Sequence, residues 1–415
     1  MSRAATVIPR AALKMLVLAA AAACAGQAGA AELQFAPAIE VGFVSDSNLR
    51  LAEVAEEVDV AGAFASGRFE FVALTPLARL SFTPRVAATY FPADEDRDED
   101  FVNGGANLLW LRDGRTISSR FQLDYDNSVT VTGNRAGTPP EDGELGNPVE
   151  DGDSGVLDQN RVKTFSAREQ LRFRLSERNA VEAGLSFTDR TFEEQSIEED
   201  VSYTAWGANL AWRHQFRERS SFALRGRAVR YNPELVPVIT QTLGLEGEWT
   251  WQASERVDTY LRLGANRASY DSSAGPDPDD RNAVVGGVGG SWRLRVSRVL
   301  LDATRSIEPN SAGYSVERSQ LRLRLDRDFS PRVRGSIAGR LLLDEGPAGF
   351  NERRYGVASI GMEWRLTRAL AIGGRYDHTW QDYDLTPGSA ASNAFRLSLT
   401  YEPRRPVEDR ASIME

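Results

Sequence analysis

Arginine recurs at every second position in several stretches of this chain, with apolar residues between. The clearest case is Arg322 and Arg324, which alternate with Leu321, Leu323 and Leu325. A guanidinium group binds carboxylate or phosphate through two hydrogen bonds and keeps its charge at any working pH. A face built from such arginines could therefore bind anions, or it could pair with carboxylates and brace a polar surface.

Eighteen arginines follow this pattern and form the candidate site. If the apolar face points outward, we expect the inner face to carry Arg68, Arg79, Arg85, Arg120, Arg168, Arg172, Arg174, Arg225, Arg227, Arg262, Arg293, Arg295, Arg322, Arg324, Arg334, Arg340, Arg375 and Arg396. Fewer carboxylates share that face, namely Glu70, Asp124, Asp126, Glu182, Glu246, Glu248, Asp302, Asp326, Glu363 and Asp377. The excess of arginine favours anions in a channel, whereas ladders of arginine and carboxylate would only solvate the interior, and both interpretations stay open.

The elements that must position these side chains are strands, because strict alternation puts one residue type on each face. Eighteen stretches alternate in this way, at 36–48, 58–73, 77–91, 101–112, 116–126, 161–175, 180–192, 201–213, 221–231, 238–252, 257–270, 282–294, 298–308, 314–329, 333–343, 354–366, 370–382 and 391–402. Long, mostly acidic connections follow the odd stretches and tight turns follow most even ones. This pattern is typical of a closed antiparallel transmembrane β-barrel. Sixteen strands are the alternative, since 58–73, 101–112 and 298–308 alternate poorly.

The positions of the aromatic residues indicate whether the apolar face meets lipid or a protein core. Six tryptophans lie toward the turn ends of the stretches, Trp110, Trp212, Trp249, Trp251, Trp292 and Trp364, and seven tyrosines toward the loop ends, Tyr90, Tyr125, Tyr231, Tyr270, Tyr314, Tyr355 and Tyr383. Two aromatic belts around an aliphatic band are typical of a bilayer-spanning barrel. We therefore expect strands in an outer membrane, because no segment has the roughly 18 apolar residues that a membrane helix needs.

The ends of the chain fit export. Three basic residues, an apolar run and Ala28-Gly29-Ala30 predict a secretory signal peptide at residues 1–30, followed by a barrel at 31–402 and a polar periplasmic tail at 403–415. Removing the signal takes away three positive charges and changes the formal net charge from −10 to −13. So acidic a chain is a poor partner for nucleic acid. The only cysteine, Cys24, lies in the signal, so no disulfide or cysteine metal site is expected.

One local segment carries a resemblance. Residues 40–49 include Asp46-Ser47-Asn48 and precede a second strand, and this opening resembles that of β-barrel porins of Gram-negative bacteria. Related barrels accompany exopolysaccharide export or exosortase systems, so the resemblance implies an outer-membrane porin fold and a link to polysaccharide export. It implies no catalytic residue.

Other candidate chemistry is sparse. His214 falls in a predicted periplasmic turn, and His378 lies near a loop end beside Asp377, so we expect no catalytic residues. Acidic loops at 94–100, 193–200 and 277–280 could hold divalent cations, but ordinary solvated loops are the simpler interpretation. Gly286-Gly287-Val288-Gly289-Gly290 predicts a bend or bulge in a strand rather than a phosphate loop. No metal and no cofactor is expected.

The sequence thus predicts an outer-membrane channel for hydrophilic, anionic solutes, with exopolysaccharide export as a specific version. The alternatives are a barrel plugged by the long loop at 127–160, serving a surface polysaccharide or protein export system as a structural partner, and an outer-membrane hydrolase. Expected partners are outer-membrane lipid and lipopolysaccharide, the barrel assembly machinery, and a hydrophilic solute or anionic polysaccharide. The oligomeric state is left open.

Overall fold

The computed structural model describes residues 32–49, 59–92, 101–130, 160–193, 201–273, 280–309, 315–346, 352–383 and 389–403. The predicted signal peptide lies outside this range, as does all of the predicted tail except Pro403. None of the described residues forms a helix long and apolar enough to cross a bilayer.

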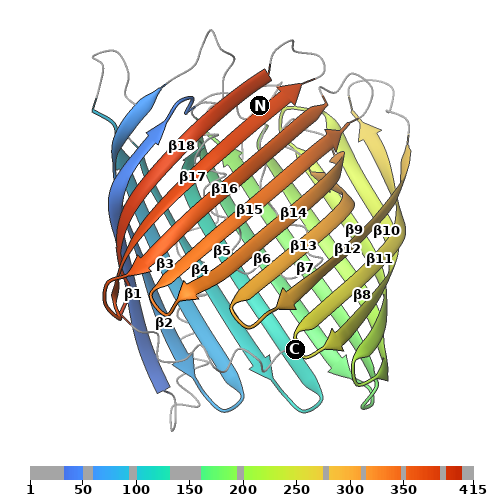
Figure 1. Ribbon diagram of the computed structural model, residues 1–415. Coiled ribbons are helices and arrows are strands. Elements are labelled where there is room, and N and C mark those ends of the chain that lie inside the picture. The colour runs from blue at the N-terminus through green and yellow to red at the C-terminus, as the bar shows by residue number, and fades with distance from the viewer. Residues whose placement is uncertain are drawn as a thin grey trace.

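Eighteen antiparallel strands form one closed sheet (Figure 1). They are β1 Glu32–Asp46, β2 Val60–Leu74, β3 Ala78–Tyr90, β4 Phe101–Asp113, β5 Ile117–Thr130, β6 Asn160–Arg174, β7 Asn179–Phe192, β8 Tyr203–Arg217, β9 Ser220–Pro233, β10 Val238–Ser254, β11 Val257–Ser272, β12 Arg281–Arg293, β13 Ser297–Pro309, β14 Ser315–Ser330, β15 Val333–Glu345, β16 Arg353–Arg365, β17 Leu370–Tyr383 and β18 Ser389–Tyr401. The predicted count of eighteen is confirmed, and sixteen is excluded.

Each strand pairs with its neighbours in sequence, and β1 pairs with β18 from Ile39↔Tyr401 to Asp46↔Ala394. A sheet with free edges inside a bilayer would leave backbone groups without hydrogen bonds, so closure is what lipid requires. The tight turns gather at the lower rim in Figure 1, and the opposite ends of the strands form the upper rim. We call these rims the turn end and the loop end.

The Asp46-Ser47-Asn48 segment fastens the barrel where its first and last strands meet. The Asn48 amide donates to Asp46 Oδ1 at 2.9 Å, and its side-chain amide donates to the Ala391 carbonyl at 3.2 Å. The Ser47 hydroxyl accepts the Asn393 amide at 3.0 Å. These residues therefore have a local structural task, which is to join the loop end of β1 to that of β18.

The outer face is apolar and open to its surroundings. Leu243, Leu261 and Leu263 expose 64%, 60% and 65% of their surface, and Trp249 and Trp251 expose 50% and 54%. So wide an apolar band in a closed barrel is the surface that a bilayer covers. The structure is that of a membrane-spanning barrel.

The tyrosine belt predicted for the loop end is partly wrong. Tyr90 and Tyr125 are exposed on the outer face, but Tyr231, Tyr270 and Tyr355 are buried and lie on the inner face. Tyr314 lies outside the described residues. The apolar clusters of the described residues lie at this end of the barrel, and tyrosine rings fill space inside it.

Two smaller expectations also change. His214 lies in β8 and pairs with Asn179 rather than lying in a turn, because β8 continues to Arg217. The glycine-rich stretch of β12 contains no bulge, since its register with β11 runs unbroken from Val257↔Trp292 to Ala268↔Arg281. Its glycines make room for the Tyr260 ring, since a Cβ on Gly289 would lie 2.7 Å from Tyr260 Cε1.

Candidate functional site

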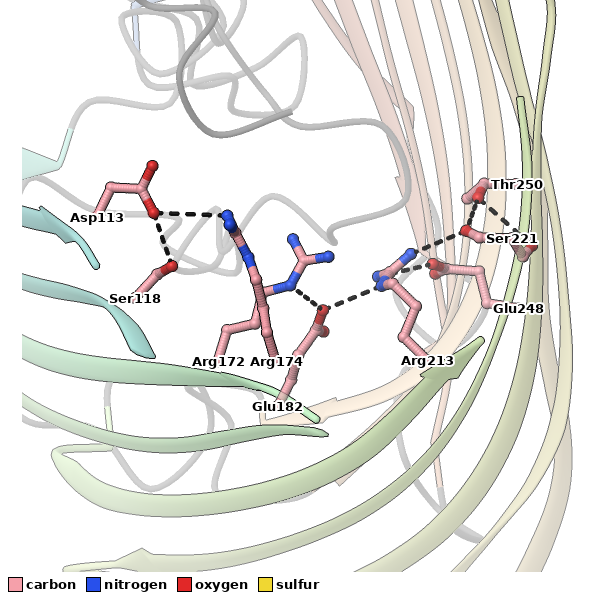
Figure 2. A network of polar contacts seen from close by, with 9 residues as sticks. All are labelled: Asp113, Ser118, Arg172, Arg174, Glu182, Arg213, Ser221, Glu248 and Thr250. Carbon is pink, nitrogen blue, oxygen red and sulfur yellow. Dashed lines mark hydrogen bonds and ion pairs between the residues drawn. The ribbon is translucent and has the colours of Figure 1, made fainter. Parts of the chain in front are cut away.

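The inner face of the wall can be assigned from one polar network. Figure 2 shows Arg172, Arg174, Glu182, Arg213 and Glu248 projecting from the concave side of the wall. Because side chains alternate along a strand and paired residues share a face, the register of the eighteen strands carries this assignment around the barrel.

Seventeen of the eighteen predicted arginines lie on the inner face by this alternation. Arg295 is the exception and lies in the turn between β12 and β13. It was assigned inward by extending the alternation past the strand, but a turn breaks the two-residue period. The ten predicted carboxylates also lie on the inner face.

The sequence reasoning missed further inner-face charges. They are Arg190, Arg213, Arg281, Arg298, Arg318, Arg353 and Arg365, with Glu32, Glu40, Asp46, Asp113, Asp258, Glu308, Asp328 and Asp344. Stepping back by twos from Arg322 along β14 would have found Arg318. Among the strand residues in regular register, twenty-four arginines thus face inward against eighteen carboxylates. Among these residues the charge of the inner face is positive on balance.

At the turn end, a chain of contacts runs along the inner face from β4 to β10 (Figure 2). Arg174 Nη2 lies 3.5 Å from Asp113 Oδ1. Glu182 Oε1 lies 3.8 Å from Arg172 Nε and 3.0 Å from Arg213 Nε. Arg213 Nη2 then reaches Glu248 Oε1 at 3.9 Å. Each of these arginines lies close to a carboxylate of another strand, so these arginines brace the wall.

A more buried group lies on β11, β13 and β14. Tyr260 donates its hydroxyl to Asp302 Oδ1 at 2.5 Å, and Arg322 Nη2 donates to Asp302 Oδ2 at 2.6 Å. The Asp302 side chain is fully buried. A buried carboxylate is stable only when its oxygens receive hydrogen bonds and an opposite charge, and here it has both.

A third group joins the last strands to the first. Arg375 Nε donates to Asp377 Oδ1 at 2.8 Å on β17, and Arg396 Nη2 lies 3.2 Å from Glu40 Oε2 across the β18–β1 closure. Arg85 Nη2 lies 2.7 Å from Asp126 Oδ1 between β3 and β5. Most inner-face carboxylates are therefore already engaged by arginine.

Some inner-face arginines, Arg298 among them, make no ion pair with another described residue. Arg225 and Arg227 lie two residues apart on the inner face of β9, half-buried, and make no ion pair with another described residue. Their cross-strand neighbours on that face include Asn209, Ala211 and Gly244, and Glu246, which pairs with Arg262 at 3.4 Å. Two arginines whose Cα atoms lie about 7 Å apart therefore face the interior without a carboxylate bound from the described part of the chain.

Neither histidine is placed as a general base beside a nucleophile. His214 Nδ1 lies 2.9 Å from Asn179 Oδ1, and its ring stacks with Trp212 on the outer face. His378 Nδ1 lies 3.0 Å from Asn393 Oδ1, also on the outer face. Among the described residues no cluster of three or more His, Cys, Asp or Glu side chains could hold a metal ion. That the chain is not an enzyme stays a prediction.

The acidic loops fall mostly outside the described residues, as do residues 131–159 of the long loop. The long loop was placed at 127–160, but β5 extends to Thr130 and β6 begins at Asn160. At the edges of two acidic loops, Glu193 Oε2 lies 3.7 Å from Arg161 Nε, and Asp280 Oδ2 lies 2.6 Å from Arg267 Nη2.

No family model matches this sequence, and no curated protein matches it significantly. Solved structures of outer-membrane barrels resemble it. The chain is similar to OccAB4 of Acinetobacter baumannii, with 14% identity, a TM-score of 0.46, and coverage of 89% of this chain and 98% of that one. It is similar to OccK2 of Pseudomonas aeruginosa in complex with glucuronate, with 14% identity, a TM-score of 0.46 and coverage of 90% and 98%. It is also similar to a BenF-like porin of Pseudomonas fluorescens Pf-5, with 11% identity, a TM-score of 0.49 and coverage of 89% and 98%.

Proposed function

We propose that this protein is an outer-membrane channel for hydrophilic solutes that favours anions. The observation that carries the proposal is the inner face, where the described arginines outnumber the described carboxylates and where Arg225 and Arg227 bind no carboxylate of the described residues. Barrels of 16 to 18 strands are wide enough for an aqueous lumen. Selectivity then depends on the charges that line it, and passage requires that binding be weak enough for release.

Reversal potentials test the charge preference directly. The purified barrel is inserted into a planar bilayer with a tenfold KCl gradient, and the potential at zero current is measured. We expect the sign that corresponds to chloride selectivity. A potassium-selective current would contradict the anion proposal, and absence of any current would favour the plugged barrel.

The long loop decides between channel and plug. A variant lacking residues 131–159 is compared with the full chain in the same bilayer. For a channel, we expect both proteins to conduct, with the loop changing the size of the current. A current found only in the deletion variant would show that the loop seals the lumen and that the structural role is the better description.

The finer proposal is that the anions include uronate-bearing polysaccharides. Arginines lie on the inner face from Arg174 at the turn end to Arg353 at the loop end, so a chain with regularly spaced carboxylates would meet guanidinium groups along its path. Polygalacturonate oligomers added to one side should interrupt the chloride current. Neutral dextran oligomers of equal length should interrupt it less, and equal block by both would contradict the finer proposal.

A further inference from the structure

The wall of the barrel is split between β12 and β13. The two strands pair only from Gly286↔Arg305 to Arg293↔Arg298, although both continue toward the loop end. Residues 281–285 remain paired with β11, and residues 306–309 remain paired with β14. Two strand edges therefore face the split without a partner. Pro309, which has no amide hydrogen, stands on one of them.

The two sides of the split overlap. Ile307 alternates with Arg305 and lies on the outer face of β13, yet it is buried in an apolar cluster with Ala283 and Val285 from the inner face of β12. An outer-face residue can contact inner-face residues only if the end of β13 lies inside the end of β12. The loop ends of β13 to β15 therefore lie on the inner side of β11 and β12. We call this the tucked position.

A group of four charges makes the same connection. Arg281, on the inner face of β12, lies 3.3 Å from Glu317 Oε2 and 3.9 Å from Glu345 Oε2. Both glutamates belong to the outer face of β14 and β15, where they pair with each other in the register. Arg305 contacts the same two carboxylates. Arg281 also donates to the carbonyls of Glu345 and Gly346 at 3.2 and 2.8 Å.

Both faces of the tucked ends are buried. Val316 on the inner face of β14 is fully buried, and Glu317 on its outer face is only 6% exposed. Ser306, Ile307 and Glu308 are buried in the same way on β13. We call residues 306–309, 315–319 and 342–345 the flap.

We propose that the flap is a gate at the loop end of the barrel, which swings between this tucked position and a position within the wall. In the tucked position the flap occupies the mouth of the lumen. If it moves outward, the existing register extends to residues 282–285 of β12 against 306–309 of β13, which closes the split and widens the mouth.

Each of the two positions is stabilised by weak interactions that the other position lacks, as an element with two stable positions requires. The tucked position gains the apolar cluster and the four-charge group but forgoes the cross-strand hydrogen bonds of the split. Each such bond adds only modestly to stability, because it replaces hydrogen bonds to water. Three of the four charged side chains are a third to a half exposed, and partly exposed ion pairs add little each. We call the contact between the flap and β12 the seam. A small change at the seam should therefore shift the equilibrium between the two positions.

Neutralising the two glutamates tests the gate. The double variant Glu317→Gln with Glu345→Gln leaves Arg281 and Arg305 facing each other without carboxylates, which disfavours the tucked position. We expect the time spent in the larger conductance level to rise at least threefold in planar bilayers. The matched control is Arg267→Gln with Asp280→Asn, which removes a 2.6 Å ion pair at the same end of β11 and β12 but outside the seam. Equal currents in the wild type and both variants would overturn the proposal.

A crosslink provides the second test, because the chain beyond the predicted signal peptide has no cysteine. Val285→Cys with Ile307→Cys is oxidised, and mass spectrometry checks the bond. We expect the oxidised protein to stay at the smaller conductance level and reduction to restore the larger one. Failure to crosslink would contradict the overlap, and identical currents before and after reduction would show a static seam.

Thiol labelling separates the gate from the channel proposal. In Val285→Cys alone, which the flap covers on the inner face of β12, a membrane-impermeant methanethiosulfonate should react faster when Glu317→Gln and Glu345→Gln are added. This readout needs no current, so it tests the flap even if the barrel does not conduct. Unchanged labelling rates would overturn the gate while leaving the channel proposal standing.

Discussion

At the scale of single residues, the useful distinction is between arginines that are engaged and arginines that are available. Arg213 bridges Glu182 and Glu248, and Arg322 is bonded to buried Asp302, so carboxylates of the wall largely neutralise their charge. Arg225 and Arg227 make no such contact among the described residues. A passing anion should therefore gain from contact with these two.

Removing this pair should weaken the preference for anions. We expect Arg225→Ala with Arg227→Ala to lower the chloride-to-potassium permeability ratio about twofold to threefold, measured as a shift in reversal potential. Arg230→Ala is the control, because it removes one positive charge from the opposite face of the same strand, and its shift is compared with half the shift of the double variant. An equal shift in the control would mean that net charge, rather than position on the inner face, sets the preference.

One carboxylate stands on the wrong face for a lipid-covered barrel. Glu169 lies on the outer face of β6, between Phe121 of β5 and Leu185 of β7, and makes no ion pair with a described residue. An acidic side chain facing lipid destabilises a barrel, with a cost that depends on its depth.

We therefore expect Glu169→Leu to stabilise the barrel by about 1 to 2 kcal/mol. The measurement is the urea midpoint of unfolding in lipid vesicles. Glu177→Leu, in the exposed turn after β6, is the control and should change the midpoint little. A lower midpoint for Glu169→Leu would indicate that this carboxylate has a partner in the native membrane assembly.

At the scale of elements, β12 determines where the wall opens. Its glycines admit the Tyr260 ring, which reaches Asp302 on β13, and pairing with β13 ends at Gly286. Below that residue the wall is braced by a buried hydrogen-bonded group, and above it the two strands separate. The glycine-rich stretch thus serves packing at the base of the flap.

A side chain at the centre of this stretch should be costly. A Cβ on Gly289 would lie 2.7 Å from Tyr260 Cε1 and 2.8 Å from the Leu301 carbonyl oxygen. Relieving these two clashes requires a neighbouring strand to move. We expect Gly289→Ala to destabilise the barrel by about 1 to 3 kcal/mol in urea unfolding. Gly374→Ala is the matched control, since a Cβ there meets nothing within 4 Å. Equal midpoints for the two variants would contradict this account of β12.

At the scale of the whole molecule, the barrel combines an acidic chain with a positive interior. The formal net charge is −10, yet the inner face carries an excess of arginine. The field inside the lumen therefore differs in sign from that of the chain as a whole.

This arrangement predicts that selectivity depends on salt. Ions shorten the screening length from about 10 Å at 0.1 M to about 3 Å at 1 M, so guanidinium groups on the wall influence the centre of a wide lumen only in dilute salt. We expect the chloride-to-potassium permeability ratio to fall toward one as KCl is raised across this range at a fixed tenfold gradient. A ratio independent of salt would indicate a constriction narrow enough for direct contact.

The sequence by itself determined that the chain forms strands with one apolar and one polar face, and it favoured eighteen of them over sixteen. It could do so because alternation with a period of two is local, and lipid demands that one face be apolar and the sheet be closed. Arg295 and His214 were misplaced because the pattern cannot show where a strand ends.

Only the tertiary structure decided which charges pair and where the wall parts. Ion pairs such as Arg213 with Glu182 depend on register between strands, which alternation along one strand leaves unspecified. The split between β12 and β13, and the contact of outer-face Glu317 with inner-face Arg281, depend on how two sheet segments overlap in space. Where the segments overlap, the outer face of β13 and β14 is buried against the inner face of β12. The alternation along a single strand cannot predict this contact.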